Sequence, residues 1–248
     1  MRDHFVVRAR WAILAVLGLY LKRVLQMLRG LVGKDPAGLK LALLLLAGFL
    51  PAAVIGLLFN DAIEEKLFGM WPIIAAWVVG GILILATAFW RKRNPVEGNG
   101  RALFEMTWKM ALLIGLLQCV AMWPGTSRSL MTIVGGLLVG LSIRAAVEYS
   151  FLLGVLTLTA ATAKKAVWKV EGLDAKYDVW LGGTHLMLDT YSAFSLFLGI
   201  AAATISAALA VKWLVSYLQS HGLTIFGWYR IALGLLIASL VLAGVVPA

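Results

Sequence analysis

A short polar segment interrupts a long apolar part of the chain. It reads Pro124-Gly125-Thr126-Ser127-Arg128-Ser129, so a permanently charged guanidinium stands among three hydroxyls. A guanidinium donates hydrogen bonds in a planar fork that matches phosphate oxygens, and hydroxyls add neutral donors. A helix that opens after this turn would add free backbone N–H groups and the positive end of its dipole. The segment therefore predicts an anion-binding site of the kind that holds a phosphate group.

The helices on either side of this segment must position it. Pro followed by Gly stops a helix, and the flanking apolar runs Met110–Met122 and Met131–Leu141 are short for a hydrocarbon core of about 30 Å. We therefore expect residues 105–143 to form a broken or re-entrant helical pair, with the second helix opening at about Thr132. A polar break at membrane depth is tolerated only where it is buried in protein or lines a watery cavity.

Arg128 itself has two interpretations. An arginine at membrane depth costs several kcal/mol unless it is partnered, which favours a functional role. The alternative is an ordinary interfacial arginine in a solvated turn, with the serines capping the next helix. Both interpretations stay open at the level of these residues alone.

The composition indicates that most of the chain faces a lipid bilayer. The 248 residues are 62% hydrophobic and 14% charged, whereas a soluble domain is about 45–50% apolar and about a quarter charged. The net charge of +10 comes from cations clumped between apolar runs, which the positive-inside rule explains better than nucleic-acid binding does. Cys119 is the single cysteine, so an intrachain disulfide and a cysteine-based metal site are excluded.

The remaining apolar runs predict an all-α integral membrane protein, a polytopic helical bundle with one domain over residues 1–248. Stretches that approach the length of a membrane span are Trp11–Leu21, Leu39–Phe59, Pro72–Trp90, Ala145–Ala163, Ser192–Leu214 and Ile225–Val246. No soluble domain or linker separates them. An inverted-repeat fold, too weak to see in one sequence, is compatible with this pattern.

The cations also predict the orientation of the helices. Lys and Arg crowd residues 22–40 and again residues 91–109, which places both connections in the cytoplasm. The loop around Lys66, with its acidic neighbours, is then external, and we expect residues 164–189 to be external as well. A helix of about thirteen residues that begins near Lys109 rises roughly 20 Å. This rise places the polar turn in the outer half of the bilayer.

The polar segment and the residues after it resemble the second signature of a known family. The strings are Trp123-Pro124-Gly125-Thr126-Ser127-Arg128-Ser129, then Thr132-Ile133 with Gly135-Gly136, then Ala145-Ala146-x-Glu148-Tyr149-Ser150-Phe151-Leu152-Leu153. The family is the bacterial undecaprenyl pyrophosphate phosphatase family of the bacitracin-resistance type. Further resemblance lies in Leu50–Gly56, in Gln118-Cys119-x-Ala121-x-Trp123 and in Tyr229-Arg230, which opens the last helix as in relatives.

The resemblance implies an enzyme of the bacterial inner membrane with inverted repeats and two re-entrant segments. Such enzymes hydrolyse the C55 isoprenyl diphosphate to the monophosphate and phosphate on the outer side of the membrane. They recycle the lipid carrier for peptidoglycan and cell-wall synthesis. The resemblance further implies a divalent cation, Mg²⁺ or Ca²⁺, and a homodimer, and no nucleic-acid partner is expected.

Carried over residue by residue, the resemblance implies that Arg128 grips the diphosphate while nearby hydroxyls donate hydrogen bonds to its oxygens. The predicted site residues are Arg128, Ser127 and Ser129 as the catalytic set, with Gly125, Thr126 and Thr132 completing substrate binding. Glu148 would stand behind them and orient Arg128. Its alternative role is a buried structural partner of a cation such as Arg144.

Two departures from the family pattern stand out. Relatives commonly have Gly directly after the second serine, where this chain has Leu130. The family's first signature, a Glu-x-x-x-Glu helix that leads into Ser-Ser-Thr-Gly-His, occurs nowhere in the 248 residues. That signature holds the family's nucleophile or general base and its metal-binding carboxylates. His185, Glu64 and Glu65 are weak candidates for a replacement base.

Three functional interpretations follow. The first is a lipid diphosphate phosphatase whose 248 residues lack an initial segment. The second is a complete homologue that binds or moves polyprenyl phosphates without hydrolysing them, and the third is a structural membrane protein with a vestigial site. Phosphoryl transfer needs an in-line nucleophile and charge neutralisation as well as a phosphate clamp. We therefore expect this chain to be inactive or impaired as a phosphatase.

Overall fold

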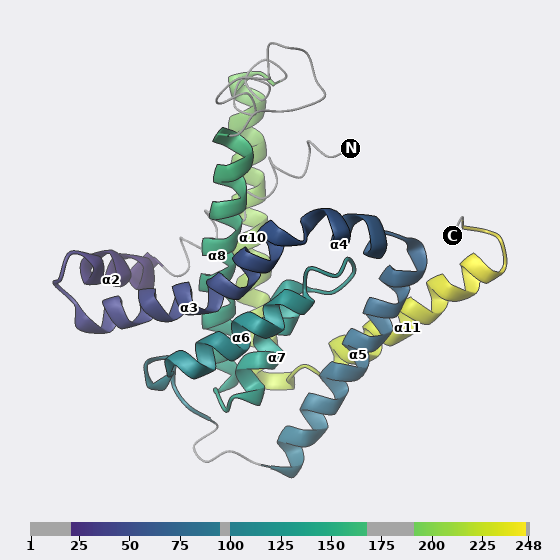
Figure 1. Cartoon of the computed structure of the whole chain (residues 1–248), viewed down its shortest axis with the longest axis horizontal. Helices are drawn as coiled ribbons and strands as arrows, with labels where there is room; N and C mark the ends of the chain where they lie inside the picture. Colours follow the sequence, from purple (N-terminus) through teal and green to yellow (C-terminus); the bar gives the residue numbers. More distant parts are fainter. Residues whose placement is uncertain (1–20, 95–99, 168–190, 247–248) are drawn as a thin grey trace. The chain divides into compact units, whose positions relative to one another are not determined.

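The computed structural model describes residues 21–94, 100–167 and 191–246, and most of these residues are helical (Figure 1). The elements are α2 (Leu21–Leu31), α3 (Pro36–Leu58), α4 (Asn60–Leu67), α5 (Met70–Arg93), η2 (Leu103–Glu105), α6 (Trp108–Val120), α7 (Arg128–Leu138), α8 (Ile143–Val167), α10 (Ala193–His221) and α11 (Thr224–Leu242). In these ranges the strand-like pairing is limited to one isolated bridge between Arg101 and Leu141. The prediction of an all-α protein is confirmed.

Five of these helices are long and apolar enough to cross a membrane. They contain the spans Pro36–Leu58, Met70–Arg93, Ile143–Ala163, Ala201–His221 and Thr224–Leu242. The helices α6 and α7 are apolar but shorter, as expected for the broken pair. The predicted polytopic arrangement is therefore confirmed for the described part of the chain. The expected run Trp11–Leu21, up to its last residue, and almost all of the loop 164–189 lie outside the described residues.

The chain divides into two compact units. One contains residues 1–26 and 154–214, and the other contains residues 27–153 and 215–248. In the first unit, α10 presents Leu198, Ile205, Leu209 and Trp213 on its exposed surface, as a lipid-facing helix does. The polar turn lies in the second unit, together with α3, α5, α6, α7 and α11. The single domain over residues 1–248 stays a prediction beside this division.

The sequence of α3 shows how a membrane helix of the second unit forms. Asp35 caps its start by accepting a hydrogen bond from the Gly38 N–H at 2.9 Å, and Pro36 occupies the first helical position, where no N–H is required. Exposed apolar side chains recur every three or four residues, at Leu39, Leu43, Leu46, Leu50, Val54 and Leu57. This spacing puts them on one face of the helix, which is the face available to lipid.

Glycines let the helices of this unit approach closely, as small residues do between membrane helices. In α6, a β-carbon at Gly115 would overlap the Gly48 carbonyl of α3. In α5, a β-carbon at Gly81 would lie 2.8 Å from the Gly227 carbonyl oxygen of α11. Figure 1 shows the resulting pairs, α3 beside α6 and α5 beside α11. These pairs form the frame around the turn.

The short helix α7 is buried along most of its length. Every residue from Leu130 to Leu137 is buried, so this helix packs on all sides against the rest of the unit. Its end is fixed by Gly140, which has φ of 89°, and the Leu141 N–H donates to the Gly136 carbonyl at 2.9 Å, as in a Schellman motif. From α5, Arg91 Nη1 also donates to the Leu137 carbonyl at 3.0 Å. The end of α7 that lies farthest from the polar turn is thereby fixed.

Candidate anion-binding site

A tight turn follows the end of α6. Pro124 takes its second position, Gly125 takes its third with φ of 90°, and the Thr126 N–H donates to the Trp123 carbonyl at 3.0 Å. This is the pattern of a type II turn, which requires positive φ at its third residue. The Pro-Gly pair satisfies both requirements. The predicted break between two helices is therefore found where the sequence placed it.

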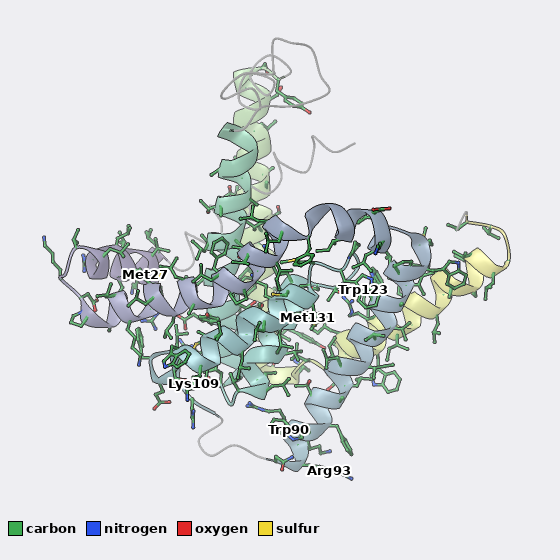
Figure 2. All side chains as sticks on the ribbon, in the orientation of Figure 1. Met27, Trp90, Arg93, Lys109, Trp123 and Met131 are labelled. Atoms are coloured by element: carbon green, nitrogen blue, oxygen red, sulfur yellow. The ribbon has the colours of Figure 1, made fainter. Side chains whose placement is uncertain are left out.

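The backbone of this turn packs directly against α5. A β-carbon at Gly125 would lie 2.9 Å from the Ile73 carbonyl oxygen and 3.1 Å from Trp77 Cδ1. Figure 2 labels Trp123 at the turn and Lys109 at the opposite end of α6. Because α6 has 13 residues, about 20 Å separates its two ends. The short rise expected from the sequence is confirmed.

The helix after the turn starts earlier than the sequence suggested. We expected it to open at about Thr132, but α7 begins at Arg128. The reason is Ser127, which caps the helix by accepting a hydrogen bond from the Leu130 N–H at 3.4 Å. Arg128 and Ser129 are therefore the first two helical residues, whose N–H groups have no partner inside the helix. The observed helix start therefore lies directly at the residue that carries the predicted guanidinium.

Four predicted site residues surround this helix start. Thr126, Ser127 and Arg128 are half-buried, and Ser129 is exposed. Among the hydrogen bonds of the described residues, the Arg128 guanidinium and the hydroxyls of Thr126 and Ser129 have no protein partner. The turn thus gathers donors that remain free to bind an anion.

Thr132 and Ser150 form a buried network behind the same helix start. The Thr132 hydroxyl lies 3.0 Å from the Arg128 carbonyl and 3.1 Å from the Ser129 carbonyl. It is also 2.6 Å from the Ser150 hydroxyl of α8, which in turn lies 3.3 Å from the Ser129 carbonyl. Thr132 is 1% exposed. The structure places Thr132 beneath the turn, whereas its direct contact with substrate stays a prediction.

The remaining candidates from the sequence are the supporting carboxylate, the replacement bases and the metal ligands. Glu148 is a half-buried residue of α8, two positions before Ser150, and its orienting role stays a prediction. Glu65 is exposed on α4, the side chain of Glu64 lies outside the described residues, and so does His185. Within the described ranges, no group of three or more His, Cys, Asp or Glu residues could hold a metal ion. The divalent cation therefore stays a prediction.

Buried polar side-chain atoms without a hydrogen-bond partner occur near the turn. In the described part of the second unit, the buried side-chain nitrogen and oxygen atoms without a hydrogen-bond partner belong to Gln118, Trp123 and Arg230. Gln118 is in the last turn of α6, Trp123 begins the polar turn, and Arg230 donates to the Gly125 carbonyl. Buried polar atoms are normally paired. Their concentration here is typical of a site that receives a polar ligand or water.

Arg230 is the residue whose place the sequence did not predict. The resemblance placed it at the opening of the last helix, but α11 begins at Thr224, so Arg230 lies inside an apolar span. From there it reaches the turn across α5. A charged residue inside an apolar run is a costly exception. A charged residue within the apolar run Ile225–Val246 was therefore the feature of the sequence that could have identified Arg230.

Most of the chain is similar to known proteins. The family model described as "Bacitracin resistance protein BacA" matches residues 5–236. The chain is 43% identical over 226 residues to the undecaprenyl-diphosphatase of Sorangium cellulosum, covering 91% of this chain and 69% of that protein. It is 42% identical over 246 residues to undecaprenyl-diphosphatase 2 of Rhodospirillum rubrum, covering 99% and 82%. For the undecaprenyl-diphosphatase of Methylococcus capsulatus, the identity is 40% over 234 residues.

Proposed function

Because this chain belongs to the family of the bacitracin resistance protein BacA, we propose that it is an undecaprenyl-diphosphatase of the bacterial membrane. The relatives matched over most of their length carry that name. The overall reaction consumes one water molecule and breaks one P–O bond of the diphosphate bridge of undecaprenyl diphosphate. The products are undecaprenyl phosphate and inorganic phosphate. The observation that carries the proposal is the set of free donors at the start of the buried helix α7.

Each residue of the turn has a defined task in this proposal. The Arg128 guanidinium binds the diphosphate through its planar fork. The hydroxyls of Thr126 and Ser129 donate to further phosphate oxygens, and Ser127 holds the helix start in place through its cap. Free N–H groups and the positive helix end act on the same anion. The turn therefore binds the diphosphate and stabilises the negative charge that is redistributed in the reaction.

The proposal assigns neither the group that attacks phosphorus nor the metal ion. Mg²⁺ or Ca²⁺ would neutralise phosphate charge in the family reaction, and the described residues contain no cluster of three or more His, Cys, Asp or Glu that marks its position. The ion is therefore a component of the assay only. A chain that binds polyprenyl diphosphate without hydrolysing it is the alternative, and the same assay separates the two.

The proposal also includes a location and an assembly. We propose that the turn opens toward the outer side of the bacterial inner membrane. The cations Arg91, Lys92 and Arg93 at the end of α5 support this, because positive-inside placement puts them in the cytoplasm. Figure 2 labels Arg93 and Lys109 toward one side of the unit and Trp123 toward the other. A homodimer, implied by family resemblance, is tested by the mass of the purified protein in detergent.

The test uses the purified chain in lipid nanodiscs with undecaprenyl diphosphate and Mg²⁺ or Ca²⁺. Binding of the lipid and release of phosphate are measured for the wild type, Arg128→Ala and Arg144→Ala. Arg144 is an exposed arginine at the start of α8, so its removal changes the net charge equally without touching the turn. We expect Arg128→Ala to reduce binding of the lipid, and whatever phosphate release the wild type shows, about a hundredfold, which is about 2.7 kcal/mol, and Arg144→Ala to leave both unchanged.

The outcomes separate the candidate functions. Phosphate release that depends on Arg128 supports the phosphatase. Saturable binding that depends on Arg128, without phosphate release, supports the non-catalytic alternative. If the wild type neither binds nor hydrolyses the lipid, the proposed site is wrong.

A further inference from the structure

A second arginine reaches the anion-binding turn from a distant helix. Arg230 of α11 donates through Nη2 to the Gly125 carbonyl at 2.8 Å and to the Ala76 carbonyl of α5 at 3.1 Å. Its path across α5 is open because residue 80 is glycine. A β-carbon at Gly80 would lie 2.9 Å from Arg230 Nη2. The two helices α5 and α11 are thus joined to the polar turn at the Gly125 carbonyl.

This arrangement is costly if its only purpose is to join helices. Arg230 lies in an apolar span long enough to cross a membrane, where a charge is expensive. Its Nε is buried without a hydrogen-bond partner in the described residues. Its guanidinium carbon lies 5.7 Å from the Trp77 ring centre, which offsets part of this cost. A neutral donor would join the helices at lower cost, so a role for the cation at the turn is favoured.

The bond to Gly125 fixes one peptide plane at both ends. The peptide between Gly125 and Thr126 is planar, so its carbonyl and its N–H point in opposite directions. The carbonyl is held by Arg230 and the N–H is held by the Trp123 carbonyl at 3.0 Å. With both ends held, this plane cannot rotate to turn its carbonyl oxygen toward a bound anion, which that oxygen would repel. Thr126 and the residues after it leave the turn in a fixed direction.

We propose that Arg230 is a positioning residue of the anion-binding site. By holding the Gly125 carbonyl, it directs Thr126, Ser127 and Arg128 toward the diphosphate and keeps a competing acceptor away from it. Arg230 acts through the turn, and its positive charge lies beside the same site. This inference rests on the proposed function, because it assigns a task in binding the diphosphate.

Arg91 provides a matched control. It also comes from a neighbouring helix and donates to two backbone carbonyls, those of Leu137 and Leu141, at 3.0 and 2.9 Å. These carbonyls lie at the far end of α7, which has 11 residues, so about 16 Å of helix separates them from the turn. Arg91→Ala and Arg230→Ala each remove hydrogen bonds from a guanidinium to backbone carbonyls. Arg91 acts at the end of α7, and Arg230 acts at the turn before its start.

The experiment measures two quantities for each variant in nanodiscs. One is the midpoint of thermal unfolding, and the other is the dissociation constant for radiolabelled undecaprenyl diphosphate in filter binding. Both variants are expected to lower the unfolding midpoint. Arg230→Ala is expected to weaken binding about tenfold, while Arg91→Ala leaves binding unchanged. Arg230→Lys, which keeps a cation and a donor, is expected to restore part of the affinity.

Gly80→Ala is the second variant and keeps Arg230 in place. Its new methyl group displaces the guanidinium from the Gly125 carbonyl, so we again expect about tenfold weaker binding. Equal dissociation constants for Arg230→Ala, Gly80→Ala and Arg91→Ala would overturn the inference while leaving the proposed function intact. If Arg230→Ala does not fold, Gly80→Ala and Arg230→Lys decide the matter in the same way. No saturable binding by the wild type would overturn the proposed function, and this inference with it.

Discussion

The hydroxyl oxygens of Thr132 and Ser150 lie 2.6 Å apart and join α7 to α8 within one helical turn of Arg128. Both residues are buried. Each hydroxyl also lies within hydrogen-bond distance of the Ser129 carbonyl. The helix start that carries Arg128 is therefore held from behind by a pair of hydroxyls, one on its own helix and one on its neighbour.

The first prediction concerns Thr132→Val, which removes this hydroxyl at nearly constant volume. We expect the free energy of unfolding to fall by about 1–2 kcal/mol, because Ser150 loses a buried partner. Binding of undecaprenyl diphosphate should weaken by no more than about threefold. Thr87→Val is the control, since Thr87 is similarly buried and its hydroxyl, among the described residues, bonds only to the Leu83 carbonyl of its own helix. Strongly weakened binding with unchanged stability would instead indicate the direct substrate contact expected from the sequence.

The second prediction separates the two tasks of Ser127. Asp is as good a helix cap as Ser and is favourable at the positive end of a helix, so Ser127→Asp should keep or raise the unfolding midpoint. Its negative charge lies beside the proposed phosphate position and should weaken binding of undecaprenyl diphosphate at least about tenfold. Ser127→Asn keeps the cap without the charge and should bind nearly as the wild type does. Wild-type affinity in Ser127→Asp would place the anion away from this helix start.

The third prediction concerns the contact of α8 with α3. The buried Tyr149 hydroxyl donates to the Leu44 carbonyl at 2.8 Å. Tyr149→Phe should lower the free energy of unfolding by about 1 kcal/mol, because one buried hydrogen bond is lost. Lipid binding should not change, since the lost bond does not involve the turn. Tyr229→Phe, at an exposed tyrosine, is the control for loss of a hydroxyl. Weaker binding in Tyr149→Phe would show that this contact also shapes the site.

Much of the site is local in the sequence, and that part was predictable. The Pro124-Gly125 pair dictates the break, and the flanking runs give the two short helices α6 and α7. The predicted start at about Thr132 was late because the predicted apolar run begins only at Met131. The capping residue determines where the helix starts. Either Ser127 or Ser129 could cap it, and the backbone conformation that makes Ser127 the cap cannot be inferred from the apolar run.

The long-range contacts were not predictable in the same way. Arg230 bonds to a carbonyl 105 positions away, and Arg91 bonds to one 46 positions away. Periodicity reports which face of a helix is apolar, but not which neighbour a charged side chain will reach. The role of Gly80, which is to leave room for the Arg230 side chain, is visible only in the packed arrangement of α5 and α11.

The fourth prediction compares two glycines with nearly equal backbone conformations. Gly125 has φ of 90° and Gly140 has φ of 89°. Substitution of either glycine by alanine should lower the free energy of unfolding by about 1–2 kcal/mol, because positive φ is unfavourable for a residue with a β-carbon. Only Gly125 is also enclosed, since its β-carbon would lie 2.9 Å from the Ile73 carbonyl oxygen, whereas Gly140 has nothing within 4 Å.

The difference between these variants therefore isolates the packing of the turn against α5. We expect Gly140→Ala to lower the unfolding midpoint modestly and to leave binding of undecaprenyl diphosphate unchanged. Gly125→Ala should lower the midpoint further and weaken binding about tenfold or more, because the methyl group lifts the turn from α5 and pulls the Gly125 carbonyl away from Arg230. Thermal unfolding and filter binding on both variants measure these effects. Equal affinities would mean that diphosphate binding does not depend on how closely the turn packs against α5.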